Sequence, residues 1–438
     1  MFISANIKKY KKIEKRFLQY ETENMTPNIK IKWKFGHGYK ITDIEKKKYI
    51  DFTSGIFTSN IGYNNKEFKR NILSALKLGF NHSYTYYNDQ REKYISKLIK
   101  FIDSKKLKKC FLVSAGTEAT EAAIKAARTF CSDQFNEKKK GIICLNGNWH
   151  GRTMGSAMLS GKNSGSDWIG FFDKNIYHLD FPYPWIHETS KKNFFKKTLL
   201  KKFKSNFPFK KKIAMIMLES FQGWGALFYP KNYIKEIAAF CKKNNILLCF
   251  DEMQAGFGRT GKRFGFQYYN VDPDMICIGK GMGSGFPLAA LVGSKKIFDN
   301  KKISGMSSTH SANPVCCAAG LSTIDIINKK KLIENSRIKG SILHKKLKLI
   351  SKNSRLIFGT YGKGLIGSLI FKDFRNNSAK RIADLVSFKC LDKGLLVCNT
   401  GRESIKLGPP LIIDKKGIEE SLKILNKSIY EVENQISK

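Results

Sequence analysis

A lysine at the end of a strand-like segment is the first feature of this chain that could do covalent chemistry. Lys280 follows the apolar run MICIG and precedes the glycine-rich segment GMGSGFP. There its ammonium group would emerge into a partly desolvated place, where the pKa of a lysine falls and the amine can form a Schiff base. A lysine at a strand end also reaches the surface easily along its aliphatic stem, so Lys280 alone does not decide between the two roles.

Two more strand-like runs end in acids. IAMIML is followed by Glu219, and ILLCF is followed by Asp251 and Glu252. Open α/β sheets gather functional groups at the carboxyl ends of their strands. A carboxylate in that position can hold a heterocyclic nitrogen protonated, which pyridoxal phosphate needs in order to act as an electron sink. Asp251 is equally suited to capping a helix.

Two further segments supply an anion site and a flat aromatic surface. In SAGTEATEAA (114–123) a strand runs into a glycine-containing turn, and a helix starts near Thr117. Backbone N–H groups and the positive helix end could face a phosphate there, although Thr117 is also an ordinary helix-start residue. NWHGRTMGS places Trp149 and His150 before Arg152. The rings could stack on a pyridine ring or simply pack, and the guanidinium could clamp a carboxylate.

The composition is that of a globular protein with a strongly basic charge. Of 438 residues, 42% are hydrophobic and 26% charged, and the net charge is +43. The basic residues are scattered between apolar segments and no recognition motif accompanies them, which makes nucleic-acid binding the weaker hypothesis. The longest apolar runs are too short to span a bilayer, and the first residues contain no secretory signal. Ten cysteines without a C-x-x-C pair indicate free thiols in a reducing cytoplasm and no metal site.

The order of the expected elements indicates an α/β fold. Residues 38–52 alternate between apolar and polar side chains around a charged turn, which predicts a hairpin. From about 110 to 300, short apolar runs alternate with helical patterns, which favours βαβ units and a largely parallel sheet. After about 330 the pattern changes to strands and helices typical of a smaller α+β domain.

Together these stretches resemble the class III (omega) aminotransferases, pyridoxal-phosphate enzymes of fold type I that include the 4-aminobutyrate, ornithine and acetylornithine aminotransferases. The resemblance runs from GYKITDIEKKKYIDFTSGI to IKLGPPLII, and LLCFDEMQAGFGRTGKRFGFQYYNVDPDMICIGKGMGSGFPLAALV matches in order and spacing throughout. It implies a large domain with a mostly parallel, seven-stranded-type sheet and a smaller α+β domain formed by the two chain ends. We predict an N-terminal segment 1–54 that joins the small domain, a large cofactor-binding domain 55–325, and a C-terminal small domain 326–438.

The resemblance also implies a role for each site residue. Lys280 would hold the cofactor and later move a proton, and Asp251 would pair with the pyridinium nitrogen. Further cofactor contacts would come from Gln254 at the 3-oxygen of the ring, Gly116 and Thr117 at the phosphate, Trp149 against the ring with His150 beside it, and Thr309 at the phosphate of the neighbouring subunit's cofactor. Arg152 would grip a distant substrate carboxylate. Glu219 would pair with a C-terminal arginine and release it when a 2-oxo acid binds.

Three places depart from the family pattern. The arginine expected in I-R-x-x-P-P-L is Lys406 in SIKLGPPL, and a lysine offers a point charge in place of a planar fork. Arg402 could substitute for it, or the amino acceptor differs from 2-oxoglutarate. Ser220 replaces a usual proline, and Ser311-Ala312 replaces a usual Gly-Gly pair. We interpret all three as signs of an unusual substrate pocket.

The predicted reaction is a ping-pong transfer of an amino group from an omega-amino acid similar to 4-aminobutyrate, or another primary amine, to a 2-oxo acid. An aminomutase, racemase or lyase on the same fold would use the same lysine and aspartate. A P-loop nucleotide hydrolase built on GFGRTGKR is a rival from another class, although Arg263 stands where that motif has Ser or Thr. We expect a cytoplasmic homodimer that acts on small molecules and has neither nucleic acid nor membrane as a partner.

Overall fold

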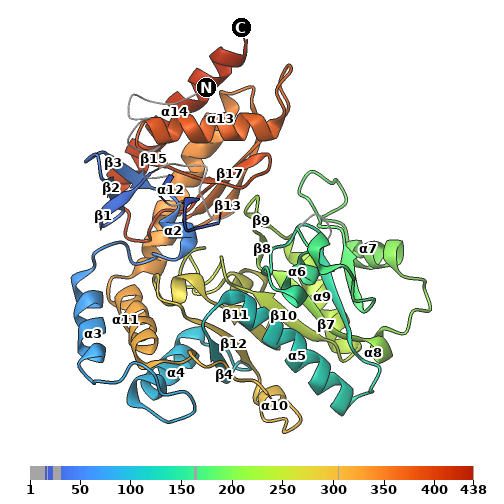
Figure 1. Cartoon of the computed structure of the whole chain (residues 1–438). Helices are drawn as coiled ribbons and strands as arrows, with labels where there is room; N and C mark the ends of the chain where they lie inside the picture. The colour runs from blue at the N-terminus through green and yellow to red at the C-terminus, as the bar shows by residue number, and fades with distance from the viewer. Residues whose placement is uncertain (1–14, 17, 23–30, 162–164, 304, 438) are drawn as a thin grey trace.

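A seven-stranded sheet forms the centre of the larger lobe in the computed structural model, which describes residues 15–16, 18–22, 31–161, 165–303 and 305–437 (Figure 1). Neighbouring strands are parallel except at β12, which is antiparallel to both β11 and β4. The spatial order is β4 (Lys109–Val113), β12 (Ala289–Gly293), β11 (Met275–Ile278), β10 (Leu247–Asp251), β7 (Ile213–Glu219), β5 (Gly141–Leu145) and β6 (Ile176–Leu179). The predicted α/β fold with a mostly parallel, seven-stranded sheet is confirmed.

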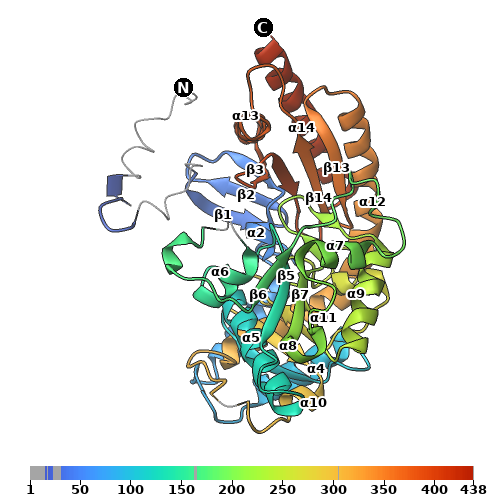
Figure 2. The same ribbon diagram turned by 90° about the vertical axis from the view of Figure 1, so that its right-hand side faces the viewer.

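Helices cover both faces of this sheet because its strands are apolar on both sides. Along β7, Met215 and Met217 belong to one core cluster, whereas Ile216 and Leu218 belong to the other. The first cluster lies against α5 (Gly116–Gln134), whose buried face is mainly alanine and allows a close approach to the strands. The second lies against α4 (Asp89–Ile102) and α9 (Lys231–Lys243). Figure 2 shows α5 and α9 on opposite sides of the strands.

Both ends of the chain contribute to a second lobe, at the top of Figure 1. The predicted hairpin in 38–52 is confirmed as two antiparallel strands, and the C-terminal strand β15 pairs with the second of them. This four-stranded sheet consists of β1 (Trp33–His37), β2 (Lys40–Asp43), β3 (Lys48–Asp51) and β15 (Leu395–Leu396). Another four-stranded sheet has β13 (Ile357–Lys363), β14 (Ile366–Phe371), β17 (Ser404–Leu407) and β16 (Cys398–Asn399). A short pair, β8 (Phe221–Gln222) and β9 (Leu227–Phe228), lies near the junction of the two lobes.

The remaining helices complete the two lobes. Asparagines begin several of them: the side chains of Asn65, Asn88 and Asn313 accept hydrogen bonds from the first turns of α3, α4 and α11. The other bounds are α2 (Ser54–Phe57), α3 (Lys66–Leu76), α6 (Met154–Ser160), α7 (Phe194–Lys202), α8 (Phe209–Lys212), α10 (Lys295–Phe298), α11 (Pro314–Lys329), α12 (Leu332–Lys352), α13 (Ala379–Asp392) and α14 (Lys415–Ser437). None of the helices in the described ranges has the length and apolar character to cross a bilayer.

The three strand ends that carry candidate residues lie side by side. β7, β10 and β11 are consecutive in the sheet, and the register places Asp251 opposite Glu219 on one side and Cys277 on the other. Lys280 follows β11 after one glycine and begins the 3₁₀ turn η4 (Lys280–Met282). Parallel strands therefore bring all three candidates to one edge, as open α/β sheets do.

The segment GFGRTGKR is a turn-rich connection and not a phosphate loop. It precedes the 3₁₀ turn η3 (Gly265–Tyr269), whereas a phosphate loop opens an α-helix. Arg259 is fully buried, and its guanidinium donates to the carbonyls of Leu365 and Pro409 and to the side chains of Ser54 and Asn60. This arginine thus fastens the connection after β10 to both chain ends. The P-loop interpretation is wrong.

Replacing Arg259 is expected to destabilise the protein strongly. Arg259→Met leaves four buried acceptors without their donor, so we expect the free energy of unfolding in urea to fall by about 3 kcal/mol or more. Arg263→Met is the matched control, because that side chain reaches solvent and pairs with the exposed Asp103. It should cost less than about 1 kcal/mol. Equal losses for the two variants would contradict the role of Arg259.

Glu252 faces away from its neighbour Asp251. Its carboxylate accepts hydrogen bonds from the Ser220 hydroxyl and from the N–H groups of Gly265 and Phe266, each of the latter at 2.7 Å. Burial raises the pKa of Glu252 to about 7, even though these three donors favour the charged form. The expectation that Ser220 shapes the substrate pocket is wrong, because its hydroxyl serves this buried acid instead.

The raised pKa predicts a specific pH dependence of stability. Since the folded-state pKa of Glu252 lies above the ordinary 4.5, the folded protein holds a proton between about pH 4.5 and 7 that the unfolded chain releases. The associated stability is greatest at low pH and falls, by up to about 3 kcal/mol, as pH rises to 7. In Glu252→Gln this contribution is absent, so the difference in unfolding free energy between variant and wild type should shift in the variant's favour across this window. A difference that is constant with pH would contradict the assignment.

Candidate active site

A cavity of about 960 Å³ opens beside Lys280, between the carboxyl edge of the central sheet and the β16–β17 strands. We call it the Lys280 cavity. Four predicted site residues line it: Trp149, Gln254, Lys280 and Lys406. The other lining residues are Ile56, Asn146, Gly147, Asn148, Ser160, Tyr183, Gly223, Trp224, Cys398, Thr400, Gly401 and Arg402. The walls therefore come from both lobes.

Lys280 is held in a strained and desolvated position. Its φ of +46° lies in the left-handed region, which costs a residue with a side chain roughly 1–3 kcal/mol and is typical of functional sites. Burial lowers the pKa of Lys280, and the charges of Asp251 and Glu219 oppose the decrease. A lysine with a lowered pKa is more readily a neutral amine, the form that acts as a nucleophile or base.

Asp251 is anchored by a histidine that lies 101 residues away in the sequence. His150 Nδ1 is 2.9 Å from Asp251 Oδ2, and the N–H of Met253 donates to Oδ1 at 3.0 Å. The backbone of His150 is held in turn, because its N–H donates to Ser160 Oγ and its carbonyl accepts from Thr120 Oγ1, both at 2.9 Å. The Asp251–His150 pair is almost completely buried. We infer that His150 fixes the orientation of this carboxylate, a contact that the sequence did not predict.

Glu219, Gln254 and Lys406 form a chain of hydrogen bonds. Lys406 Nζ donates to Gln254 Oε1 at 2.8 Å, and Gln254 Nε2 donates to Glu219 Oε1 at 3.3 Å. The second oxygen of Glu219 accepts the N–H groups of Trp149 and Gly223. Burial raises the pKa of Glu219 to about 7, with His150 opposing the increase. Burial also lowers the pKa of Lys406. The Gln254 amide therefore links a carboxyl group with a raised pKa to an amine with a lowered pKa.

The start of α5 is where the sequence predicts an anion site, and that role stays a prediction. The helix begins at Gly116, and the first turn of any α-helix leaves N–H groups without acceptors inside the helix. A Cβ on Gly116 would come within 2.9 Å of Met253 Sδ, so this position admits no side chain. Thr117 Oγ1 lies 2.6 Å from Thr153 Oγ1 and 3.0 Å from Ser156 Oγ, which brings the loop after Trp149 against the helix start.

Arg152 and Thr309 do not line the cavity. The Arg152 guanidinium lies 4.8 Å from the centre of the Trp149 ring and is exposed. Thr309 is also exposed, in the segment that leads to α11. The roles that the resemblance implies for both residues, and for the Trp149 ring, remain predictions.

Residues that the sequence did not single out complete the cavity. Tyr183 and Trp224 supply aromatic walls, Cys398 comes from β16, and Thr400 comes from the β16–β17 connection. No spacing or motif links these distant segments, so only the folded chain places them together. Arg402, which the sequence offered as a substitute for the missing arginine, does line the cavity.

The Ser311-Ala312 pair lies outside the residues that line this cavity. Ser311 Oγ donates to the carbonyl of Ser308 at 2.8 Å. Ala312 has a φ of +56°, in the region that favours glycine, which accounts for the glycine expected there. In the described chain these two residues shape the turn before α11 and not the wall beside Lys280.

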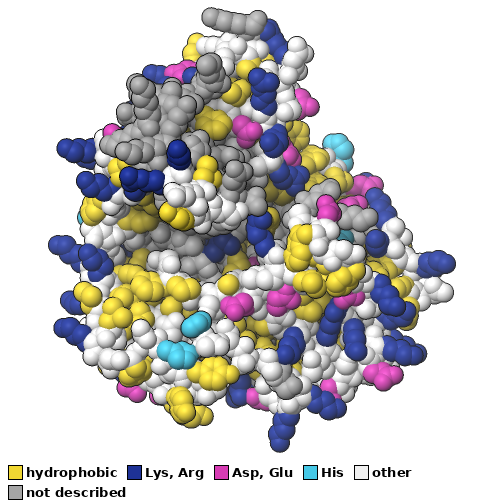
Figure 3. Space-filling view, viewed as in Figure 1, with side chains coloured by type: hydrophobic (Ala, Val, Ile, Leu, Met, Phe, Trp, Pro, Cys, Tyr) yellow, Lys and Arg dark blue, Asp and Glu magenta, His cyan; other side chains and the backbone are white. Residues whose placement is uncertain are grey.

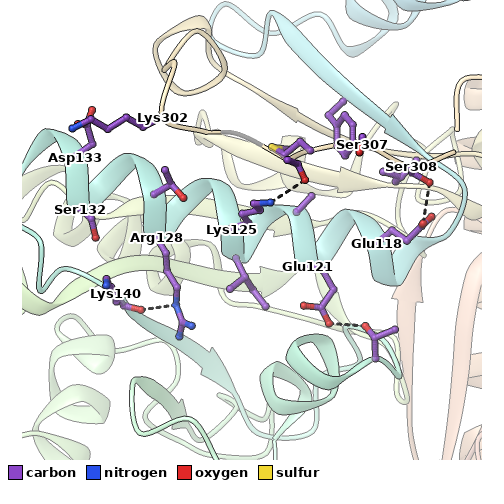
Figure 4. A pocket seen from close by; sticks show the side chains of 18 residues that line it. Glu118, Glu121, Lys125, Arg128, Ser132, Asp133, Lys140, Lys302, Ser307 and Ser308 are labelled. Carbon is purple, nitrogen blue, oxygen red and sulfur yellow. Dashed lines mark hydrogen bonds and ion pairs between the residues drawn. The ribbon is translucent and has the colours of Figure 1, made fainter. Parts of the chain in front are cut away.

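A second cavity, of about 920 Å³, lies between α5 and the segment around Ser307 (Figure 4). Several of its polar side chains already have partners: Lys125 donates to the carbonyl of Gly305 at 2.9 Å, and Ser308 donates to Glu118 at 3.2 Å. The lysine and acids at the ends of β11, β10 and β7 do not line it. We therefore place the chemistry in the Lys280 cavity.

The residues around the Lys280 cavity fit pyridoxal phosphate. Lys280 offers the amine for a Schiff base, Asp251 a buried carboxylate for a protonated ring nitrogen, and the start of α5 a place for the phosphate. Gly223, which also lines the cavity, admits no side chain, because a Cβ there would come within 2.7 Å of Glu219 Oε1 and 2.3 Å of Gln254 Nε2.

Known proteins similar to this chain share its length as well as its fold. Residues 22–429 match the family described as Aminotransferase class-III. Ornithine aminotransferase 1 of Staphylococcus saprophyticus is 31% identical over 413 residues, which cover 93% of this chain and 97% of the relative. The acetylornithine/succinyldiaminopimelate aminotransferase of Buchnera aphidicola from Acyrthosiphon pisum is 30% identical, with 91% of each chain covered.

Solved structures agree with the sequence relatives. A transaminase from the marine bacterium Virgibacillus superimposes with a TM-score of 0.88 at 25% identity, covering 97% of this chain and all of the other. Together with the lysine, carboxylate and helix start at one sheet edge, these similarities identify the chain as a member of the class III aminotransferases, transaminases that depend on pyridoxal phosphate.

Proposed function

We propose that the protein transfers an amino group from an omega-amino acid similar to 4-aminobutyrate, or from a similar primary amine, to a 2-oxo acid. The observation that carries this proposal is the position of Lys280. Its amine is partly buried and lies near enough to Asp251 for that carboxylate's charge to oppose the fall in the lysine pKa, and the same cavity contains the cationic side chains of Arg402 and Lys406. The Lys280 amine could form a Schiff base, and the Arg402 and Lys406 cations could bind carboxylates. Such a site suits substrates that carry both an amine and a carboxylate.

The residues of this chain would divide the work. When bound, pyridoxal phosphate supplies an electron sink for the carbon that loses its proton. Asp251, oriented by His150, would keep the ring nitrogen protonated. Lys280 Nζ would hold the cofactor and, once released as a neutral amine, would take and return the proton. Gly116 and Thr117 would bind the phosphate, and Gln254 would contact the ring oxygen.

Carboxylate recognition is the part of the proposal that concerns the substrate. We propose that Arg152 grips the distant carboxylate of the amino donor, and that Glu219 and Lys406 respond to the 2-oxo acid. The relatives named for ornithine and acetylornithine support a donor of this kind, since both of those compounds carry an amine and a carboxylate at a distance. An aminomutase, racemase or lyase would give no net amino transfer to an added 2-oxo acid, which separates those reactions from this one.

We propose that the functional unit is a homodimer. Hydrophobic side chains that are exposed in the single chain gather on and after α3 (Figure 3), among them Leu73, Leu76 and Phe80. The ring of His82 lies 5.9 Å from that of His310, so this apolar segment is next to the exposed Thr309. A second copy seated here would cover the patch and bring Thr309 to the phosphate of its partner's cofactor.

Two further parts of the proposal concern the organisation of the chain and its location. We propose an N-terminal segment 1–54 that joins the small domain, a large domain 55–325 and a small domain 326–438, which is supported by the pairing of β15 with β3. A cytoplasmic location is supported by the ten cysteines, all of which are free thiols. The dark blue basic side chains in Figure 3 are scattered over the visible face, which favours small-molecule substrates over a nucleic acid.

Removal of the reactive amine is the direct test of the proposed function. Purified wild-type protein should be yellow, and a primary amine substrate should bleach it. Lys280→Ala should fold and take up the cofactor without covalent attachment, and amino transfer from 4-aminobutyrate or ornithine to 2-oxoglutarate should fall by at least about 1,000-fold. Wild-type transamination in this variant would refute the role of Lys280.

Disruption of the apolar patch tests the dimer. Leu76→Asp places a charge in the proposed interface, so the variant should sediment as a monomer and lose most of its activity. Leu349→Asp is the control, because that leucine is equally exposed but lies on α12 in the other lobe. It should remain a dimer with normal activity. A dimeric Leu76→Asp protein would contradict the proposed interface.

A further inference from the structure

Arg402 presents a guanidinium group to the Lys280 cavity. Its guanidinium carbon lies 4.0 Å from the centre of the Trp224 ring, a distance typical of a stacked cation–π contact. The Trp224 ring is fixed in turn, since its Nε1 donates to Gln222 Oε1 at 2.7 Å. About two fifths of the Arg402 side chain remains accessible, at 42%. The arginine is thus positioned by a rigid surface while its donors stay within reach of a ligand.

The contacts of the Arg402 guanidinium are few and long. Its carboxylate partner in the described chain is the adjacent Glu403, with Nη2–Oε1 at 3.4 Å and Nε–Oε2 at 3.5 Å. Both distances exceed the 2.7–2.9 Å of a strong charge-assisted hydrogen bond. Gly147, which also lines the cavity, lies near the guanidinium, since a Cβ on it would be 3.7 Å from Arg402 Nη1. The planar fork is therefore only weakly neutralised.

The other cations of the cavity are already engaged. Lys280 is the residue proposed to hold the cofactor. Lys406 donates to Gln254 at 2.8 Å, and its Nζ lies 4.8 Å from the centre of the Phe57 ring. Lys406 is buried, with 7% of its surface exposed, whereas Arg402 reaches the open part of the cavity. Arg402 is thus the cation that an incoming anion meets with its hydrogen-bond donors available.

We infer that Arg402 binds a carboxylate of the 2-oxo acid substrate, and that Glu403 pairs with the guanidinium when that carboxylate is absent. Arg402, in the β16–β17 connection, would then supply the planar pair of donors for a carboxylate that Lys406 lacks. The inference rests on the proposed function, since it names a specificity residue of the same site. It identifies a 2-oxo acid as the class of acceptor favoured over neutral aldehydes.

Steady-state kinetics with two acceptors test this assignment. Arg402→Ala should raise the KM for 2-oxoglutarate roughly 10- to 100-fold, because a bidentate charge-assisted contact is lost. The rate at which the amino donor bleaches the bound cofactor, and turnover with an uncharged aldehyde acceptor, should change less than about threefold. Arg402→Lys should recover only part of the affinity. Arg381→Ala removes an exposed arginine on α13 and controls for the loss of general positive charge.

A binding measurement separates this inference from the proposed reaction. Calorimetry with glutarate, which cannot react, should show at least tenfold weaker binding to Arg402→Ala holoenzyme than to wild type. Glu403→Gln should bind glutarate more tightly, because the competing carboxylate is gone. Unchanged glutarate affinity in Arg402→Ala, or an unchanged KM for 2-oxoglutarate, would overturn the role of Arg402. Absence of amino transfer in the wild type would instead refute the proposed function, and the glutarate titration would still decide the role of Arg402.

Discussion

The burial of several charges at one sheet edge is the constraint on which the rest of the site depends. A carboxylate or ammonium group removed from water is stable only where hydrogen-bond partners replace the solvent. Asp251 receives His150 and a backbone N–H, Glu219 receives two backbone N–H groups and Gln254, and Lys406 donates to the same amide. The segments after β5, β7 and β10 deliver these donors. These partners do not fully replace the lost solvent, so burial still lowers the pKa of Lys280 and raises the pKa of Glu219.

The fold and the centre of the site could be predicted from the sequence because both depend on local patterns. Apolar runs that end in a charged residue mark buried parallel strands, and the ends of such strands share an edge, which is why Glu219, Asp251 and Lys280 were identified. The contact between His150 and Asp251 could not be predicted, since 101 residues separate them and the contact depends on the ring orientation of the histidine. Sequence spacing carries no information about such a contact.

Adjacent acids illustrate how strand geometry assigns different functions to similar residues. Asp251 ends β10 and faces His150, whereas Glu252 turns to the opposite side and accepts three hydrogen bonds from Ser220 and the η3 turn. Successive side chains of an extended chain point to opposite sides. The family resemblance assigns the ring nitrogen to Asp251, and from the sequence the serine after Glu219 indicates an unusual substrate pocket. The side on which each residue lies, and not its type, decides that Ser220 belongs to the scaffold.

The replacement of an arginine by Lys406 has a physical consequence beyond the loss of a fork. An ammonium group is compact, so Lys406 can donate to Gln254 inside the wall while Gln254 still reaches Glu219. A point charge in that position organises the wall but offers a planar carboxylate no matched pair of donors. A matched pair is present four residues earlier, in the β16–β17 connection, where the Trp224 ring supports the flat guanidinium of Arg402. Burying one cation and exposing the other divides between two residues the tasks of balancing Glu219 and meeting the substrate.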